Sequence, residues 1–163
     1  MSAIATIEEA SASGLCTACG IPLDAQYFDD SSVTEPPDVG SEVVLAKFEL
    51  PAQYCGLLQN FSQFTDLHGS DLANVLTPGL EWRILLNSRA LFPYVSLRHI
   101  VNPWGFGGFP VNIRLDEAST VELVVRGVVD NQNAGAQPIR LVGGRIIGRF
   151  WYNASYGDVV SRR

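Results

Sequence analysis

The stretch VNIRLDEASTVELVVR, residues 111–126, determines the fold class of this chain. Apolar residues recur in it at every second position, at Val111, Ile113, Leu115, Val121, Leu123 and Val125. Successive side chains of a β-strand point to opposite faces, so this period of two predicts half-buried strands. We expect one strand at 111–115 and a second at 119–128.

The same alternation continues on both sides of this stretch. It predicts further strands at 42–50, 53–65, 80–87 and 139–152. The alternation at 53–65 breaks near Gln59-Asn60, which indicates a β-bulge. Gly143-Gly144 is expected to interrupt the last strand. Residues 88–110 are the most irregular part of the body, with one further strand expected near 94–100.

These segments predict an all-β chain with six to eight strands and no helical segment above about eleven residues. We expect an antiparallel β-sandwich, and the long loops between strands favour a jelly-roll-like topology over an immunoglobulin-like one. The expected organisation is an acidic, extended N-terminal arm at 1–41, a sandwich domain at 42–153 and a polar tail at 154–163. Residues 13–41 are expected to be irregular, with a turn at 29–32.

The charges are unevenly placed along the chain. Residues 1–41 carry seven acidic residues and no Lys or Arg, and residues 42–163 carry eleven basic and ten acidic residues. Ten of the eleven basic residues are arginines. Arginine suits protein interfaces because its planar guanidinium can form two parallel hydrogen bonds with one carboxylate. Two hypotheses follow for the arm: it docks on its own or a neighbouring body, or it is solvated and frayed.

Composition also excludes several classes of function. The net charge of −6 and the scattered arginines argue against nucleic-acid binding as the main task. We expect no membrane partner, because no stretch is long and apolar enough to span a bilayer. The first residues, MSAIATIEEASASG, lack the basic region of a secretory signal, so we expect synthesis in a cytoplasm.

Cys16-Thr17-Ala18-Cys19-Gly20 is the sharpest local motif. A C-x-x-C turn presents two thiolates to one tetrahedral zinc, and Cys55 with His68 or His99 could complete the site. The chain has no second C-x-x-C and no H-x-x-x-H, so half a zinc ribbon is a weak signal. Reduced structural thiols and a disulfide formed after release are the competing hypotheses, and we expect no cofactor.

No catalytic constellation is present in the sequence. Asp66, His68 and Ser70 lie close together, but a hydrolase triad is assembled by the fold, and no G-x-S-x-G elbow appears. A polar loop explains these residues better. We therefore expect a protein that is not an enzyme.

An aromatic and glycine-rich loop at 102–110 contains Trp104, Phe106 and Phe109. Exposed aromatic rings there could stack on sugars or anchor a neighbouring subunit. Alternatively, the rings are buried by the chain's own fold. We favour burial, by the chain itself or by a neighbour, over ligand binding.

The last strand carries large apolar residues on both faces, which indicates a strand that is central or covered by another layer. Arg145 and Arg149 lie on one of these faces. They could bind an anion, but arginines that form ion pairs or contact a neighbouring subunit are the simpler interpretation.

Residues 49–152 contain an ordered series of strand patterns. These are a strand ending in Pro51, the strand CGLLQNF at 55–61, a "W-x-I-x-x-N" strand at 81–87, a proline-led strand at 110–115, the strand at 121–126 and a final Gly-Arg-x-x-Gly-Arg-aromatic strand at 144–150. In this layout, about two thirds of the chain resembles small structural proteins of tailed-bacteriophage virions. The acidic arm falls outside the resemblance.

The resemblance implies a jelly roll that decorates the capsid or sits at the neck, collar or fibre-attachment region. It implies assembly as a trimer or ring with itself and with other virion proteins, and localisation in the virion. We expect the arm to latch onto a neighbouring subunit or the shell. The alternative is a glycan-binding β-sandwich module that uses the 102–110 loop.

Overall fold

The computed structural model describes residues 21, 25–66, 79–91, 109–128 and 139–152. In this part of the chain there are eight strands and no helix. The strands are β1 (Gln26–Thr34), β2 (Glu42–Glu49), β3 (Tyr54–Thr65), β4 (Leu80–Leu86), β5 (Arg89–Ala90), β6 (Phe109–Leu115), β7 (Thr120–Gly127) and β8 (Val142–Tyr152).

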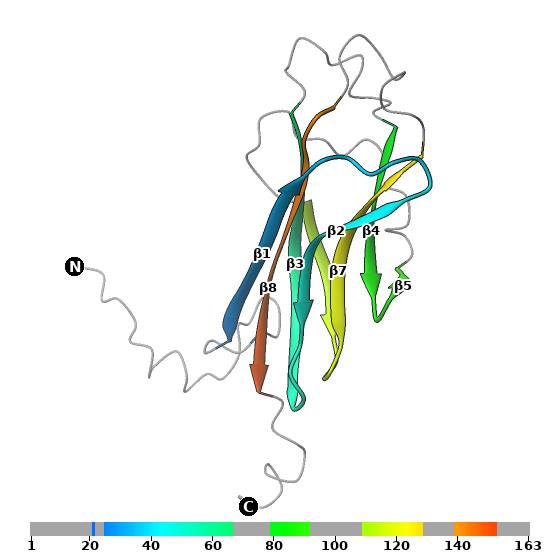
Figure 1. Cartoon of the computed structure of the whole chain (residues 1–163). Coiled ribbons are helices and arrows are strands. Elements are labelled where there is room, and N and C mark those ends of the chain that lie inside the picture. Colours follow the sequence, from blue (N-terminus) through cyan, green and yellow to red (C-terminus); the bar gives the residue numbers. More distant parts are fainter. Residues whose placement is uncertain (1–20, 22–24, 67–78, 92–108, 129–138, 153–163) are drawn as a thin grey trace, which may run out of the picture.

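The strands form two four-stranded sheets, with strand orders β1-β8-β3-β6 and β2-β7-β4-β5. Figure 1 shows β1, β8 and β3 in one layer and β2, β7, β4 and β5 in the other. All strand pairs are antiparallel. The predicted antiparallel β-sandwich is therefore confirmed.

The strand pairing follows a nested order. β1 pairs with β8, β2 with β7, β3 with β6, and β4 with β5. The pairs β3–β8 and β4–β7 then join this folded ribbon into two sheets. An antiparallel ribbon rolled around one core in this way is a jelly roll, so the preferred topology is confirmed as well.

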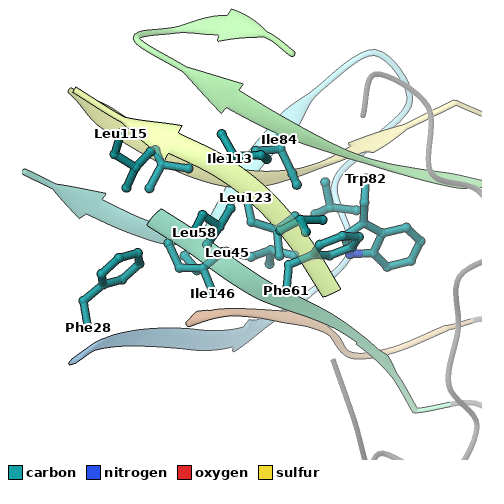
Figure 2. Close-up of a cluster of buried hydrophobic side chains, with 14 of the residues drawn as sticks. Phe28, Leu45, Leu58, Phe61, Trp82, Ile84, Ile113, Leu115, Leu123 and Ile146 are labelled. Atoms are coloured by element: carbon teal, nitrogen blue, oxygen red, sulfur yellow. The ribbon is translucent and has the colours of Figure 1, made fainter. Parts of the chain in front are cut away.

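The core lies between the two sheets and is filled by the apolar side of the alternating strands. Leu58, Trp82, Ile84, Leu123 and Ile146 are all fully buried. In Figure 2 the cluster extends from Phe28 at one end to Trp82 at the other. Trp82 and Ile84 of the "W-x-I-x-x-N" strand are thus core residues, as the alternation predicts.

Asn87, the last residue of the "W-x-I-x-x-N" pattern, lies in the turn of the hairpin between β4 and β5. Asn87 and Ser88 have φ angles of 52° and 63°, which are the left-handed values required by a type I′ turn. The backbone N–H of Asn87 donates to the Thr120 carbonyl, and the Thr120 N–H donates to Asn87 Oδ1, each over 2.8 Å. The side chain therefore ties the hairpin to the start of β7.

The expected bulge in β3 is confirmed. The register of β3 shifts between Leu58 and Asn60 against both of its neighbours, β6 and β8. A bulge of this kind bends a strand and increases its twist. A second register shift, between Val44 and Ala46 of β2, was not predicted.

The expectation of an irregular segment at 13–41 is wrong for residues 26–34, because β1 is a regular strand. All nine of its residues pair with β8, and Asp29-Asp30-Ser31-Ser32 lies inside the strand rather than in a turn. Alternation did not reveal β1, because Phe28 is its only buried residue. The arm at 1–20 and the tail at 154–163 lie outside the described residues.

The expected interruption of β8 at Gly143-Gly144 is also wrong. β8 runs without a break from Val142 to Tyr152, and it lies between β1 and β3, which confirms that it is central. These glycines permit close packing: a Cβ atom on Gly144 would lie 2.6 Å from Cδ2 of Leu123. The expected strand near 94–100 lies outside the described residues.

Candidate subunit interface

The outer face of the β1-β8-β3-β6 sheet carries Arg145 and Arg149, the two arginines that the sequence singled out. We call it the arginine face. Its residues on β8 are Arg145, Ile147, Arg149 and Trp151, which alternate with the buried Ile146. Neighbouring residues on the same face are Tyr27, Asp29, Ser31 and Val33 of β1 and Cys55, Leu57, Asn60, Ser62 and Phe64 of β3.

Arg145 forms a two-point ion pair with Asp29, across the β1–β8 junction. Its Nε donates to Oδ1 of Asp29 over 2.7 Å, and its second nitrogen donates to Oδ2. The hydrogen bond from Arg145 is the main cause that lowers the pKa of Asp29, and the positive charge adds to it. An acidic residue of the predicted arm thus docks on an arginine of the body, here within one chain.

Arg149 interacts with Tyr27 in two ways. Its guanidinium carbon lies 4.4 Å from the centre of the Tyr27 ring, within cation–π distance, and one nitrogen donates to the Tyr27 hydroxyl. Tyr27 remains 64% exposed. Among the described residues, Arg149 forms no ion pair.

Apolar groups are exposed at the other end of the arginine face. Val33 and Phe64 lie on either side of Gly143 in the register of the sheet, and they are 58% and 42% exposed. Leu57, Ile147 and Trp151 are half-buried. An outer sheet face with exposed aliphatic and aromatic groups and arginine has the composition typical of a protein interface.

The outer face of the β2-β7-β4-β5 sheet differs, because two of its basic residues each lie close to two glutamates. We call it the ion-pair face. Arg83 lies 2.9 Å from Glu42 and 3.8 Å from Glu81, while Lys47 lies 2.7 Å from Glu49 and 3.7 Å from Glu122. These pairs satisfy the charges locally, as expected of a face in contact with water.

The open side between the two sheets is closed by β1. The Asp30 carboxylate accepts a hydrogen bond from the backbone N–H of Lys47 over 2.7 Å, and the Ser32 hydroxyl donates to the Leu45 carbonyl. β2 is the edge strand of its sheet, and unpaired edge groups invite association with other chains. The polar residues of β1 therefore cover part of the β2 edge.

The remaining candidate residues are only partly described. Phe109 begins β6, and its ring lies 5.6 Å from the buried Phe61, so it packs against the core and not on an open face. This placement is the one in which the chain's own fold buries the ring. Trp104 and Phe106 lie outside the described residues.

The proposed zinc ligands Cys16, Cys19, His68 and His99 also lie outside the described residues. Cys55 is a free, half-buried thiol opposite Trp151, and burial raises its pKa. Within the described residues no three His, Cys, Asp or Glu side chains gather as metal ligands would. The zinc site stays a prediction.

Comparison with known proteins finds no family model that matches the chain and no matching curated protein. The resemblance to virion proteins therefore depends on the strand patterns quoted above. Over the part of the chain that is described, no helix has the length and hydropathy needed to cross a membrane.

The sequence identified Arg145 and Arg149 but missed the residues that partner them. Asp29 and Tyr27 are 116 and 122 residues away from these arginines. The only sequence signal for them was the acidic, lysine-free and arginine-free segment at 1–41, which suggested docking on an arginine-bearing body.

Proposed function

We propose that this chain is a non-enzymatic structural protein of a virion, a decoration, neck or fibre-attachment component that assembles with copies of itself and with other virion proteins. The jelly roll is common to viral capsid proteins, lectins and cupins, so the topology supports this proposal without deciding it. The resemblance of residues 49–152 to phage structural proteins favours the first of these groups.

The observation that carries the proposal is the contrast between the two outer faces. Among the described strand residues, the arginine face leaves three large apolar or aromatic side chains, Tyr27, Val33 and Phe64, between 42% and 64% exposed, whereas the ion-pair face leaves one, Val44, at 48%. An exposed apolar face on a chain with 17% charged residues favours burial against another subunit. A second copy of this chain is the partner we propose for that face.

A matched pair of substitutions tests this assignment. Val33 and Val44 are both exposed valines on edge strands, at 58% and 48%, but Val33 lies on the arginine face and Val44 on the ion-pair face. We expect the wild-type chain to sediment as a trimer or ring. Val33→Asp should lower the sedimenting mass at equal concentration, because it places a charge in the interface, and Val44→Asp should leave it unchanged.

Two results would contradict the proposal. A wild-type chain that stays monomeric at every concentration and does not bind capsid or connector protein would remove the function. Equal effects of the two substitutions would remove the assignment of the interface to the arginine face. A monomer that binds immobilised glycans through Trp104 would support the alternative, a glycan-binding module.

A further inference from the structure

β1 joins the sandwich through its backbone and a single buried side chain. Phe28 is 5% exposed, and its ring stacks on Phe48 with the ring centres 4.0 Å apart and the planes 3° from parallel. The ring also occupies the space beside Gly148, where a Cβ atom would lie 2.4 Å from Phe28 Cζ. The other residues of β1 are exposed or half-buried, so its removal would take one anchor from the core.

The site that receives β1 is specific for it. We call this site the β1 slot, formed by Gly143–Arg149 of β8 and by Leu45 and Lys47 of β2. Besides the Gly148 hollow for the Phe28 ring, Arg145 pairs with Asp29, and Lys47 N–H binds Asp30. Without β1, β8 would become an edge strand, and the apolar surface that the Phe28 ring covers, at Gly148 and Phe48, would be exposed. The segment that best matches the slot is another β1.

The chain leaves β1 through a short, stiff segment. Pro36 and Pro37 follow Glu35, and prolines restrict the backbone of this segment to extended conformations. The next residues are anchored: Val39 bridges to Gly127, and the Gly40 N–H donates to the Gly127 carbonyl over 2.9 Å. Glu35–Pro37 is therefore the segment in which a change of direction would redirect β1 and leave the sandwich intact.

We infer that β1 is exchanged between copies of this chain, so that β1 of one copy fills the β1 slot of the next. This inference rests on the self-association proposed above. Exchange recreates each contact that β1 makes within one chain, which makes it a low-cost route to an oligomer. If each copy donates β1 to the next in a head-to-tail arrangement, the subunits form a closed trimer or larger ring. Residues 1–25, which precede β1, would then lie on the neighbouring subunit.

A disulfide across the β1–β8 junction tests the connectivity. Ser31 and Arg145 are directly opposite each other, at a Cα separation of about 4.5–5.5 Å that a disulfide can span. Ser31→Cys with Arg145→Cys is introduced into full-length protein in which Cys16, Cys19 and Cys55 are serines. The control is Ser62→Cys with Arg145→Cys, because Ser62 is the β3 residue opposite Arg145 and belongs to the same sandwich.

The oligomer fraction is oxidised and run on a non-reducing gel. In the Ser31→Cys, Arg145→Cys variant we expect a disulfide between two chains. In the Ser62→Cys, Arg145→Cys control we expect a disulfide within one chain. Oligomers whose Ser31 pair links only within one chain would overturn the exchange and leave the proposed function intact. A sample with no oligomer at all would overturn both. A Ser31 pair that forms no disulfide would disprove the register, and with it the exchange.

A second variant leaves the β1 slot unchanged. Pro36→Gly with Pro37→Gly makes the segment flexible, so that β1 folds back onto its own chain more easily. We expect a smaller oligomer share in sedimentation than for the wild-type chain. Pro51→Gly, in the exposed turn before β3, is the control and should have no effect on this share. An unchanged share in the first variant would overturn the exchange.

Discussion

The two sheets of this sandwich share one core but present different surfaces. On the ion-pair face, Lys47 and Arg83 each lie within 4 Å of two glutamates. On the arginine face, Arg145 has one carboxylate partner and Arg149 has a tyrosine. The pleat and the alternation are the same on both sides, so the difference lies in the residues at the outward positions. It is the basis for proposing that one face contacts water and the other contacts protein.

The central strands of the two sheets differ in the same sense. β7 fills its inner face with Val121, Leu123 and Val125, all fully buried. β8 instead places Gly144 and Gly148 on its inner face, and their missing side chains make room for Leu123 and for the Phe28 ring. The glycines of β8 thus make room for one side chain from the opposite sheet, Leu123 of β7, and for one from the neighbouring strand of the same sheet, Phe28 of β1.

The largest effect should come from filling the hollow in β8. In Gly148→Ala the new Cβ would lie 2.3 Å from the Leu57 carbonyl oxygen and 2.4 Å from the Phe28 ring. Because the first of these is backbone, the strand itself must shift. We expect the free energy of unfolding to fall by about 3 kcal/mol, the upper end for overpacking, measured by urea denaturation.

The control for this change is Gly143→Ala, on the outer face of the same strand. Its Cβ would lie 2.9 Å from the Ser32 carbonyl oxygen, a longer backbone contact than at Gly148, and 3.0 Å from Cγ2 of the exposed Val33. We expect a smaller loss of stability. Equal losses would show that the inner glycines are not a special feature of β8.

A smaller effect should separate the two faces by their arginines. Arg83→Leu removes the ion-pair partner of Glu42 and a positive charge near Glu81. Glu81 is only 6% exposed. We expect a loss of about 1–2 kcal/mol in the free energy of unfolding, as for a partly buried charged hydrogen bond. Arg145→Leu breaks a more exposed pair and should cost less stability. The reverse order would contradict the division between a self-satisfied face and a contact face.

Alternation in the sequence predicted the strands that bury one side of themselves, and with them most of the core. β2, β3, β4, β6, β7 and β8 agree with the expected ranges to within three residues at either end. This success has a simple cause, because each of these strands has an apolar side facing the other sheet. The order of the strands was not predictable, since pairing partners such as β1 and β8 lie far apart in the chain.

β1 escaped prediction for the opposite reason. Asp29, Asp30 and Ser32 are residues typical of turns, and here their side chains bond to Arg145 and to the backbone of β2. Local propensity therefore indicated a turn, and tertiary contacts override it. For the same reason, the partners of Arg145 and Arg149 could not be named from the sequence.

The smallest effect concerns pH and compares one carboxylate from each face. The ion pair with Arg145 lowers the pKa of Asp29 below its ordinary value of 3.8, and the pair with Lys47 lowers the pKa of Glu49 below 4.5. A lowered folded-state pKa adds stability above the unfolded-state value, and this stability disappears as the pH falls through the folded-state pKa. Both pairs should therefore stabilise the fold at neutral pH and not in strong acid.

Urea denaturation of Asp29→Asn and Glu49→Gln, from neutral pH down to about pH 2, compares the two pairs. Each variant should be less stable than the wild type at neutral pH, and each difference should vanish in acid. The loss should be larger for Asp29, which receives two hydrogen bonds and has a side chain 44% exposed, against one ion pair and 68% for Glu49. If Glu49→Gln costs as much, Asp29 is an ordinary surface charge and does not hold β1 in its slot.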